Sequence, residues 1–94
     1  MKRIPIIDDN WESDGWFDMD IAERLGSDWE HDARRWHAIW RTRGGAYVRG
    51  AFSLYQGERD TYERISADRA ALLLIQWRES LPADLESLAE NTEI

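Results

Sequence analysis

The sequence predicts an α+β fold, in which a three-stranded antiparallel meander packs against a central helix, with a short N-terminal helix and a short C-terminal helix. Residues 35–41 and 46–55 alternate apolar and polar side chains, as half-buried strands do. A helical spacing of apolar residues follows over residues 66–79. Because three strands need a cover on at least one face, we expect this helix to pack on the sheet.

Turn residues separate the predicted strands. Residues 43–45, Arg-Gly-Gly, predict a hairpin, since glycine supplies the positive φ that such turns need. Residues 56–59 predict a second turn and residues 61–65 the third strand. An additional short strand is expected around Pro5, where three isoleucines cluster and proline is tolerated at an edge. The acidic stretch 8–15 is expected to be a loop.

Helix positions follow from capping residues and apolar spacing. The first helix is expected over residues 18–26, with an aspartate as N-cap and a glycine after the last turn. The central helix is expected to begin after the cap Ser66 and to run to about residue 79. The last, acidic helix is expected over residues 81–88, where leucines recur at helical spacing.

The length of 94 residues fits one domain, 1–94, with an acidic N-terminal segment (1–15) and a frayed tail (91–94). The absence of cysteine excludes a disulfide scaffold, a thiol nucleophile and cysteine-based metal sites. No apolar run approaches the roughly 18 residues that span a bilayer, and no signal-peptide core follows the first residues. We therefore expect a cytoplasmic protein without membrane contact.

Charge is distributed along the chain as acid, base, acid. Residues 1–30 hold nine acidic and three basic residues, 31–70 hold eight arginines and five acidic residues, and 71–94 hold Arg78 and five acidic residues. The net charge is −7. A surplus of this sign repels nucleic acid and attracts cationic surfaces. We therefore expect no direct DNA binding.

Catalytic and metal-binding patterns are absent from the sequence. The two histidines, His31 and His37, match no usual ligand spacing, so no metal is expected. Ser53 lies in no nucleophile-elbow pattern, and the Gly44-Gly45 pair lacks the lysine and helix of a phosphate-binding loop. We expect neither an enzyme nor a bound cofactor.

Arginines and tyrosines on one predicted sheet face offer an alternative site. Arginine beside stackable rings is suited to single-stranded RNA or another anionic ligand. The residues concerned are Arg35, Arg41, Tyr47, Arg49 and Tyr55. The competing interpretation is that these arginines stack on aromatic rings and pair with the acidic ends of the chain.

Several motifs resemble a family of small uncharacterised bacterial proteins. These motifs are a Trp-Phe-Asp start at 16–18, an Arg-Thr-x-Gly-Gly hairpin at 41–45, a Ser-x-x-Gln-Gly turn at 53–57 and an Ile-Ser helix cap at 65–66. The resemblance covers about residues 15–77 and implies no activity, and the acidic ends depart from it. In size, acidity and lack of catalytic motifs the chain is also similar to phage-encoded anti-CRISPR inhibitors, a likeness that implies carboxylates imitating DNA phosphates.

These observations predict a small acidic inhibitor or interaction protein that blocks the nucleic-acid-binding surface of a protein partner by DNA mimicry. A CRISPR–Cas effector is one candidate for this partner. The predicted partner-binding residues are Asp8, Asp9, Trp11, Glu12, Asp14, Asp18, Asp20, Asp84, Glu86 and Glu90. Tryptophan is included because it is a common hot spot in interfaces. The chain is expected to be a monomer or a homodimer. The alternative is a regulatory module that contacts RNA or an anionic ligand through the arginine and tyrosine residues above.

Overall fold

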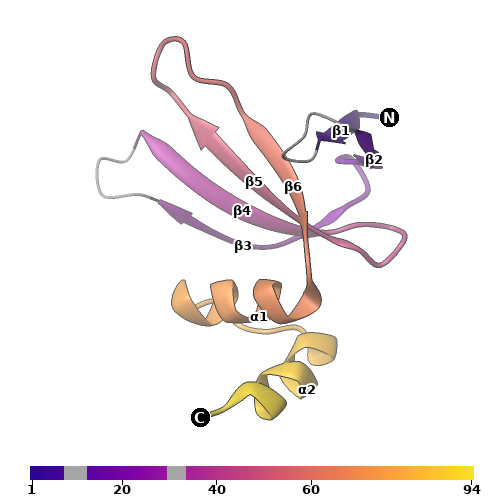
Figure 1. Ribbon diagram of the computed structural model, residues 1–94, viewed down its shortest axis with the longest axis vertical. Coiled ribbons are helices and arrows are strands. Elements are labelled where there is room, and N and C mark those ends of the chain that lie inside the picture. The colour runs from indigo at the N-terminus through magenta and orange to yellow at the C-terminus, as the bar shows by residue number, and fades with distance from the viewer. Residues whose placement is uncertain (8–12, 30–33) are drawn as a thin grey trace.

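The computed structural model describes residues 1–7, 13–29 and 34–94 (Figure 1). In these ranges the chain forms six strands and two helices. Their bounds are β1 (Arg3–Ile7), β2 (Ser13–Asp18), β3 (Glu23–Trp29), β4 (Arg35–Arg41), β5 (Tyr47–Ser53), β6 (Thr61–Ile65), α1 (Ala67–Gln76) and α2 (Ala83–Thr92). Strands β3-β4-β5-β6 form one antiparallel sheet in that order, and β1 and β2 form a separate hairpin.

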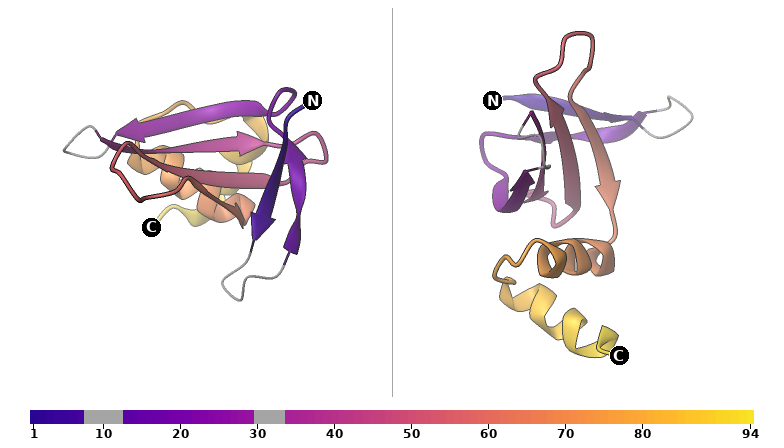
Figure 2. Two further views of the ribbon diagram at one scale, coloured as in Figure 1. Left: turned by 90° about the horizontal axis from the view of Figure 1, so that it is seen from above. Right: turned by 90° about the vertical axis from the view of Figure 1, so that its left-hand side faces the viewer.

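The molecule has three layers, with the four-stranded sheet in the middle. Figure 2 shows the β1–β2 hairpin crossing one face of the sheet and the two helices covering the other. Successive residues of β4 point to opposite faces, so Ile39 joins the helical core and its neighbours Ala38 and Trp40 join the hairpin core. Each face of the sheet therefore has its own hydrophobic core.

The helix-side core gathers residues of the sheet, α1 and α2. Its largest fully buried side chains are Ile39, Leu74 and Leu85. The hairpin-side core is largely aromatic: the Phe17 ring lies 6.1 Å from Trp40 and 5.9 Å from Tyr62, centroid to centroid. Phe17 of β2 thus fixes the hairpin against the sheet.

The predicted fold class is wrong. The structure is mostly β, with six strands in two antiparallel sheets and two helices, instead of a three-stranded meander with an N-terminal helix. The meander β4-β5-β6 is present, but β3 extends it by a fourth strand, and the β1–β2 hairpin packs on the face opposite the helices.

The helix expected over residues 18–26 does not form. Asp18 does begin a turn, because its carbonyl accepts hydrogen bonds from the backbone N–H groups of Ile21 (3.3 Å) and Ala22 (3.0 Å). The chain then enters β3. Pairing with β4 gives hydrogen-bond partners to the backbone N–H and C=O groups over a longer stretch than one helical turn does. Gly26 is a strand residue: a Cβ there would come within 2.7 Å of Leu74 Cδ2 of α1.

Other element predictions are confirmed. Strands β1, β4 and β6 lie where they were expected, and the hairpin before β5 closes with Gly45 at φ +86°. Ser66 caps α1 by accepting a hydrogen bond from the backbone N–H of Arg69 (3.1 Å).

The bounds of several predicted elements were wrong. Helix α1 ends at residue 76, earlier than expected, and α2 extends into the segment expected as a frayed tail. Residues 13–15, expected as loop, belong to β2.

Within the described residues, no helix is long and apolar enough to span a membrane.

Candidate functional site

The N-terminal acidic residues lie on the hairpin side of the sheet. Asp14 is exposed in β2, Asp18 ends that strand and Asp20 lies in the turn before β3. Four predicted partner-binding residues fall outside the described ranges: Asp8, Asp9, Trp11 and Glu12.

Two of these acidic residues hold the turn together. A carboxylate oxygen of Asp18 accepts hydrogen bonds from the backbone N–H groups of Lys2 (3.1 Å) and Asp20 (3.0 Å). The Asp20 carboxylate pairs with the N-terminal ammonium of Met1 at 3.3 Å. Asp18 therefore contributes to local structure as a turn cap.

Asp84, at the start of α2, is bound by two strand residues. Its carboxylate accepts hydrogen bonds from Arg41 Nη1 (2.6 Å) and from the Tyr47 hydroxyl. Arg41 also donates from Nη2 to Glu23 of β3 (2.8 Å). The hydrogen bond from Arg41, followed by that from Tyr47, lowers the pKa of Asp84 below its ordinary value. Burial raises the pKa of Tyr47 above 10.0, and its hydrogen bond to Asp84 adds to this shift. This group ties α2 to the sheet.

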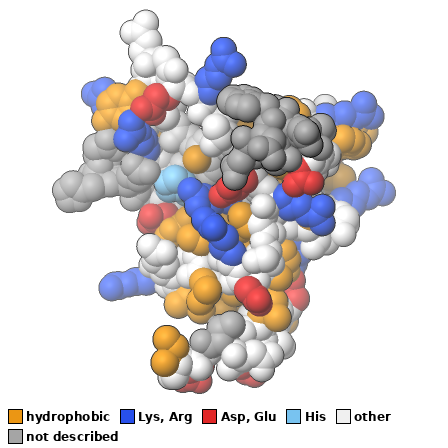
Figure 3. Space-filling model, in the orientation of Figure 1, with side chains coloured by type: hydrophobic (Ala, Val, Ile, Leu, Met, Phe, Trp, Pro, Cys, Tyr) orange, Lys and Arg blue, Asp and Glu red, His pale blue; other side chains and the backbone are white. Residues whose placement is uncertain are grey.

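Glu86 and Glu90 point away from the core on α2. Leu85, which precedes Glu86, is fully buried in the helix-side core. Glu93 follows at the C-cap, so the three exposed glutamates stand at positions i, i+4 and i+7 and share one face. None of the three forms an ion pair within the described residues. In Figure 3 the helical end of the molecule shows hydrophobic and acidic side chains, whereas most Lys and Arg side chains lie over the sheet.

The predicted acidic residues therefore form two groups rather than one. The hairpin and the helices lie on opposite faces of the sheet (Figure 2). Asp14 and Asp20 are in the first group, and Glu86 and Glu90 are in the second. A single flat partner surface would contact one group at a time.

Four residues of the alternative site lie on one sheet face, Tyr55 lies in the bend after β5, and the five are engaged in separate interactions. At one end of the sheet Arg41 and Tyr47 bind Asp84. In the middle, Arg49 Nη1 lies 3.6 Å from a carboxylate oxygen of Glu63.

At the opposite end, Arg35 pairs with Glu58 and stacks over the Tyr55 ring at 4.9 Å. Arg34 lies over the same ring at 5.7 Å. Of these ion pairs, only those of Arg41 join the acidic ends of the chain, as the structural interpretation expects, because Glu58 and Glu63 belong to the basic middle segment.

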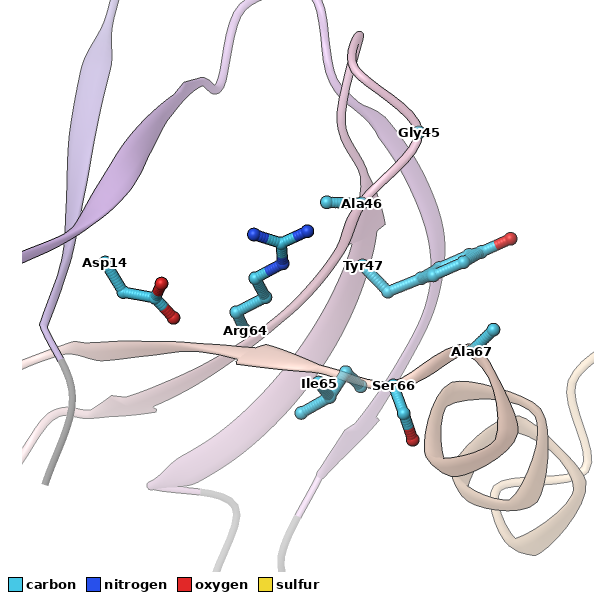
Figure 4. Close-up of a pocket in the computed structure, with 8 residues that line it drawn as sticks. All are labelled: Asp14, Gly45, Ala46, Tyr47, Arg64, Ile65, Ser66 and Ala67. Carbon is cyan, nitrogen blue, oxygen red and sulfur yellow. The ribbon is translucent and has the colours of Figure 1, made fainter.

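A cavity of about 460 Å³ opens between the hairpin and the start of α1. Figure 4 shows the charged groups of Asp14 and Arg64 directed toward the same space, whereas the Tyr47 ring points away toward the helices. Gly45, Ala46 and Ser66 supply backbone and small side chains to the lining. Among the described residues that line this cavity, Arg64 is the one basic side chain and the Tyr47 ring is turned away, so these residues offer little for a specific ligand.

A second cavity, of about 490 Å³, lies on the hairpin side of the sheet, and the sequence-based reasoning missed it. Its lining includes the partly exposed rings of Trp36, Phe52 and Tyr62. No local pattern indicates a cavity, although Ala38 and Gly50 are small residues at facing positions of β4 and β5.

Within the described ranges, no group of three or more His, Asp or Glu side chains could hold a metal ion. Comparisons of the chain with family models, with curated proteins and with solved structures find no match. The resemblances seen in the sequence motifs therefore stay predictions, and the functional argument rests on this chain's own geometry.

Proposed function

We propose that the protein is a small acidic binding protein, without catalytic activity, that occupies a basic, nucleic-acid-binding surface of a protein partner. The observation that carries the proposal is the exposed stripe of Glu86, Glu90 and Glu93 on α2. The helix contains no basic residue, and Leu85 and Leu88 anchor it from the opposite side.

The spacing of the stripe suits this role. At about 1.5 Å of rise per residue, the three carboxylates span roughly 10 Å along the helix axis. One strand of DNA carries a phosphate for about every 3.4 Å of axis, hence about three over the same length. The stripe thus presents a charge density close to that of one nucleic-acid strand.

The net negative charge of the molecule also favours binding to a basic partner. Arg41, Arg49 and Arg35 are each paired with carboxylates of this chain. Over the whole chain the acidic residues outnumber the basic ones by seven. A field of this sign accelerates association with a basic partner and weakens as salt is added.

The predicted acidic residues do not contribute equally to this function. Asp18, Asp20 and Asp84 are engaged within the molecule, so we assign partner contact to Glu86 and Glu90, with Glu93 added. Asp14 is exposed on the other face and remains a predicted contact, as do the N-terminal residues outside the described ranges. A CRISPR–Cas effector is one partner of the required chemistry, and it would place the protein in the cytoplasm.

The proposal is tested with the variant Glu86→Gln/Glu90→Gln/Glu93→Gln, which keeps side-chain size and removes three charges. Immobilised protein is incubated with nuclease-treated bacterial lysate at low salt and eluted with a short DNA duplex. We expect the wild type to retain proteins that the duplex displaces and the triple variant to lose most of them, because the opposed charges are gone.

The matched control is Asp60→Asn/Asp68→Asn/Glu79→Gln, which removes the same number of charges from exposed positions outside α2. It should retain the same proteins as the wild type. Equal retention by the α2 variant, or retained proteins that DNA fails to displace, would show that α2 does not act as a DNA mimic.

A further inference from the structure

The cavity on the hairpin side of the sheet has a wall of aromatic rings. Trp36 of β4 and Phe52 of β5 stack with centroids 5.3 Å apart and an interplanar angle of 22°. Trp40 and Tyr62 meet the Phe52 ring edge-on, at 5.7 Å each. Trp36, Phe52 and Tyr62 remain partly exposed, so flat apolar surface faces the cavity.

The strand register explains why a hollow forms here. Across the sheet, Ser27, Ala38, Gly50 and Tyr62 lie side by side. The first three are small, and on the same face of β4 Ala38 lies between Trp40 and Trp36. At Gly50 the rings of Trp40 and Phe52 close over the backbone, within 2.8 Å of where a Cβ would be. The small side chains of Ser27 and Ala38 thus leave open space over β3 and β4, and Met19 of the turn before β3 also lines the cavity.

Two basic residues line one end of the cavity. Lys2 and Arg24 flank the turn at 19–22, where the backbone N–H of Met19 donates to the Lys2 carbonyl (2.9 Å). Both side chains are exposed, and neither forms an ion pair within the described residues. Asp60 lines the cavity from the opposite edge, beside β6. The cavity therefore has a positive and a negative end.

We propose that this cavity binds a free mononucleotide, with the base against the aromatic wall and the phosphate at Lys2 and Arg24. A volume of about 490 Å³ is in the usual range for small-ligand sites. Rings of Trp, Tyr and Phe stack on any nucleobase, and paired cations bind phosphate oxygens. Repulsion from Asp60 keeps the phosphate at the other end.

The size of the ligand follows from the charge of the protein. A net charge of −7 opposes the approach of a polyanion, because its many phosphates are repelled by the acidic surface of the protein. A mononucleotide places its one phosphate at the local basic end. This site is independent of the carboxylate stripe on α2, which lies on the other face of the sheet.

The test is a titration of the full chain with adenosine monophosphate, followed by tryptophan fluorescence and by the NMR signals of the indole N–H groups. Ribose 5-phosphate and adenosine are titrated separately as truncated probes. We expect saturable binding of the nucleotide and at least about tenfold weaker binding of either fragment, since each lacks one of the two contacts.

The variant Arg24→Gln should weaken binding of adenosine monophosphate by about tenfold, and Lys2→Gln by a similar factor, through loss of a charge-assisted hydrogen bond. Both positions are exposed, so the fold is retained. The matched control Arg43→Gln removes one positive charge from the exposed hairpin and should leave the affinity unchanged.

Three results would overturn the proposal. The first is no saturation up to about 10 mM nucleotide, which is weaker than a functional site requires. The second is equal affinity of the Arg24→Gln and Arg43→Gln variants. The third is tighter binding of a five-nucleotide RNA than of adenosine monophosphate, which would contradict a site for the free nucleotide.

Discussion

Asp84 joins helix α2 to the sheet through side chains of two adjacent strands. Arg41 of β4 and Tyr47 of β5 stand opposite each other in the register, and both donate to its carboxylate. Arg41 is 43 residues away in the chain, so no local pattern could have indicated this contact. The sequence predicted Asp84 as a partner-binding residue, and the structure places it in an internal ion pair.

The substitution Asp84→Asn should lower the free energy of unfolding near neutral pH by about 1 kcal/mol, since the pair is partly exposed. The pKa of Asp84 is lowered in the folded protein, so its stabilising contribution is present above the ordinary value of 3.8. That contribution is lost as the pH falls through the lower, folded-state pKa.

Urea unfolding of the wild type and of Asp84→Asn over a pH series measures this difference. The two curves should converge only in strong acid. A difference that is absent at neutral pH, or that stays constant into strong acid, would contradict the role assigned to the carboxylate.

At the scale of secondary structure, the elements with strong local signals were predicted well. Strand β4 has an alternating sequence, a turn precedes β6 and Ser66 caps α1, and each of these signals acts within a few residues. Strand β3 has no such alternation, and its pairing with β4 is a tertiary interaction. Asp18 accepts backbone hydrogen bonds in a turn as it would at a helix start, so the residue alone cannot distinguish the two.

The exposed acidic face of α2 was likewise foreseeable. Glu86 and Glu90 follow a helical spacing next to the apolar Leu85 and Leu88, which a sequence reveals directly. The aromatic cavity was not foreseeable as a cavity, because it depends on the hairpin covering only part of the sheet. Residues of β3, β4, β5 and β6 line it together with Lys2, Met19 and Asp60, and the topology of the fold brings them together.

Helix α2 should be the first element to detach from the molecule. It packs mainly on α1 and depends on one fully buried side chain, Leu85. The substitution Leu85→Ala removes contacts worth about 2–5 kcal/mol and should release α2 while the sheet persists.

Amide hydrogen exchange measures this release. Faster exchange is expected in α2, with unchanged protection in β4 and β5. The control Ser87→Ala alters an exposed position of the same helix and should leave exchange nearly unchanged. Uniform loss of protection across the sheet in Leu85→Ala would show that α2 is part of the global folding unit.

At the scale of the whole molecule, one sheet separates two hydrophobic cores. Ile6 lies in the hairpin-side core and Ile39 in the helix-side core, and the two clusters share no residue. The proposed functional surfaces follow the same division, with the carboxylate stripe on the helical side and the aromatic cavity on the hairpin side. Partner binding and ligand binding therefore use separate layers.

This separation predicts additive energetics. Ile6→Val and Ile39→Val should each lower the free energy of unfolding by about 0.5–1.5 kcal/mol. The double variant should show their sum within about 0.5 kcal/mol, because the sites share no partners. Chemical denaturation of the wild type, the two single variants and the double variant measures this double-mutant cycle. A coupling energy above about 1 kcal/mol between the two sites would indicate that strain is transmitted through the sheet.

Strand β3 is an outer strand of the four-stranded sheet, with β4 as its neighbour, and its register shifts between Arg24 and Gly26. An outer strand is a template on which another chain can add a strand and begin an aggregate. The bulge interrupts the regular row of N–H and C=O groups, and charged side chains at Glu23, Arg24 and Asp28 make such an addition costly. The irregularity of β3 thus protects the sheet against growth by edge-to-edge association.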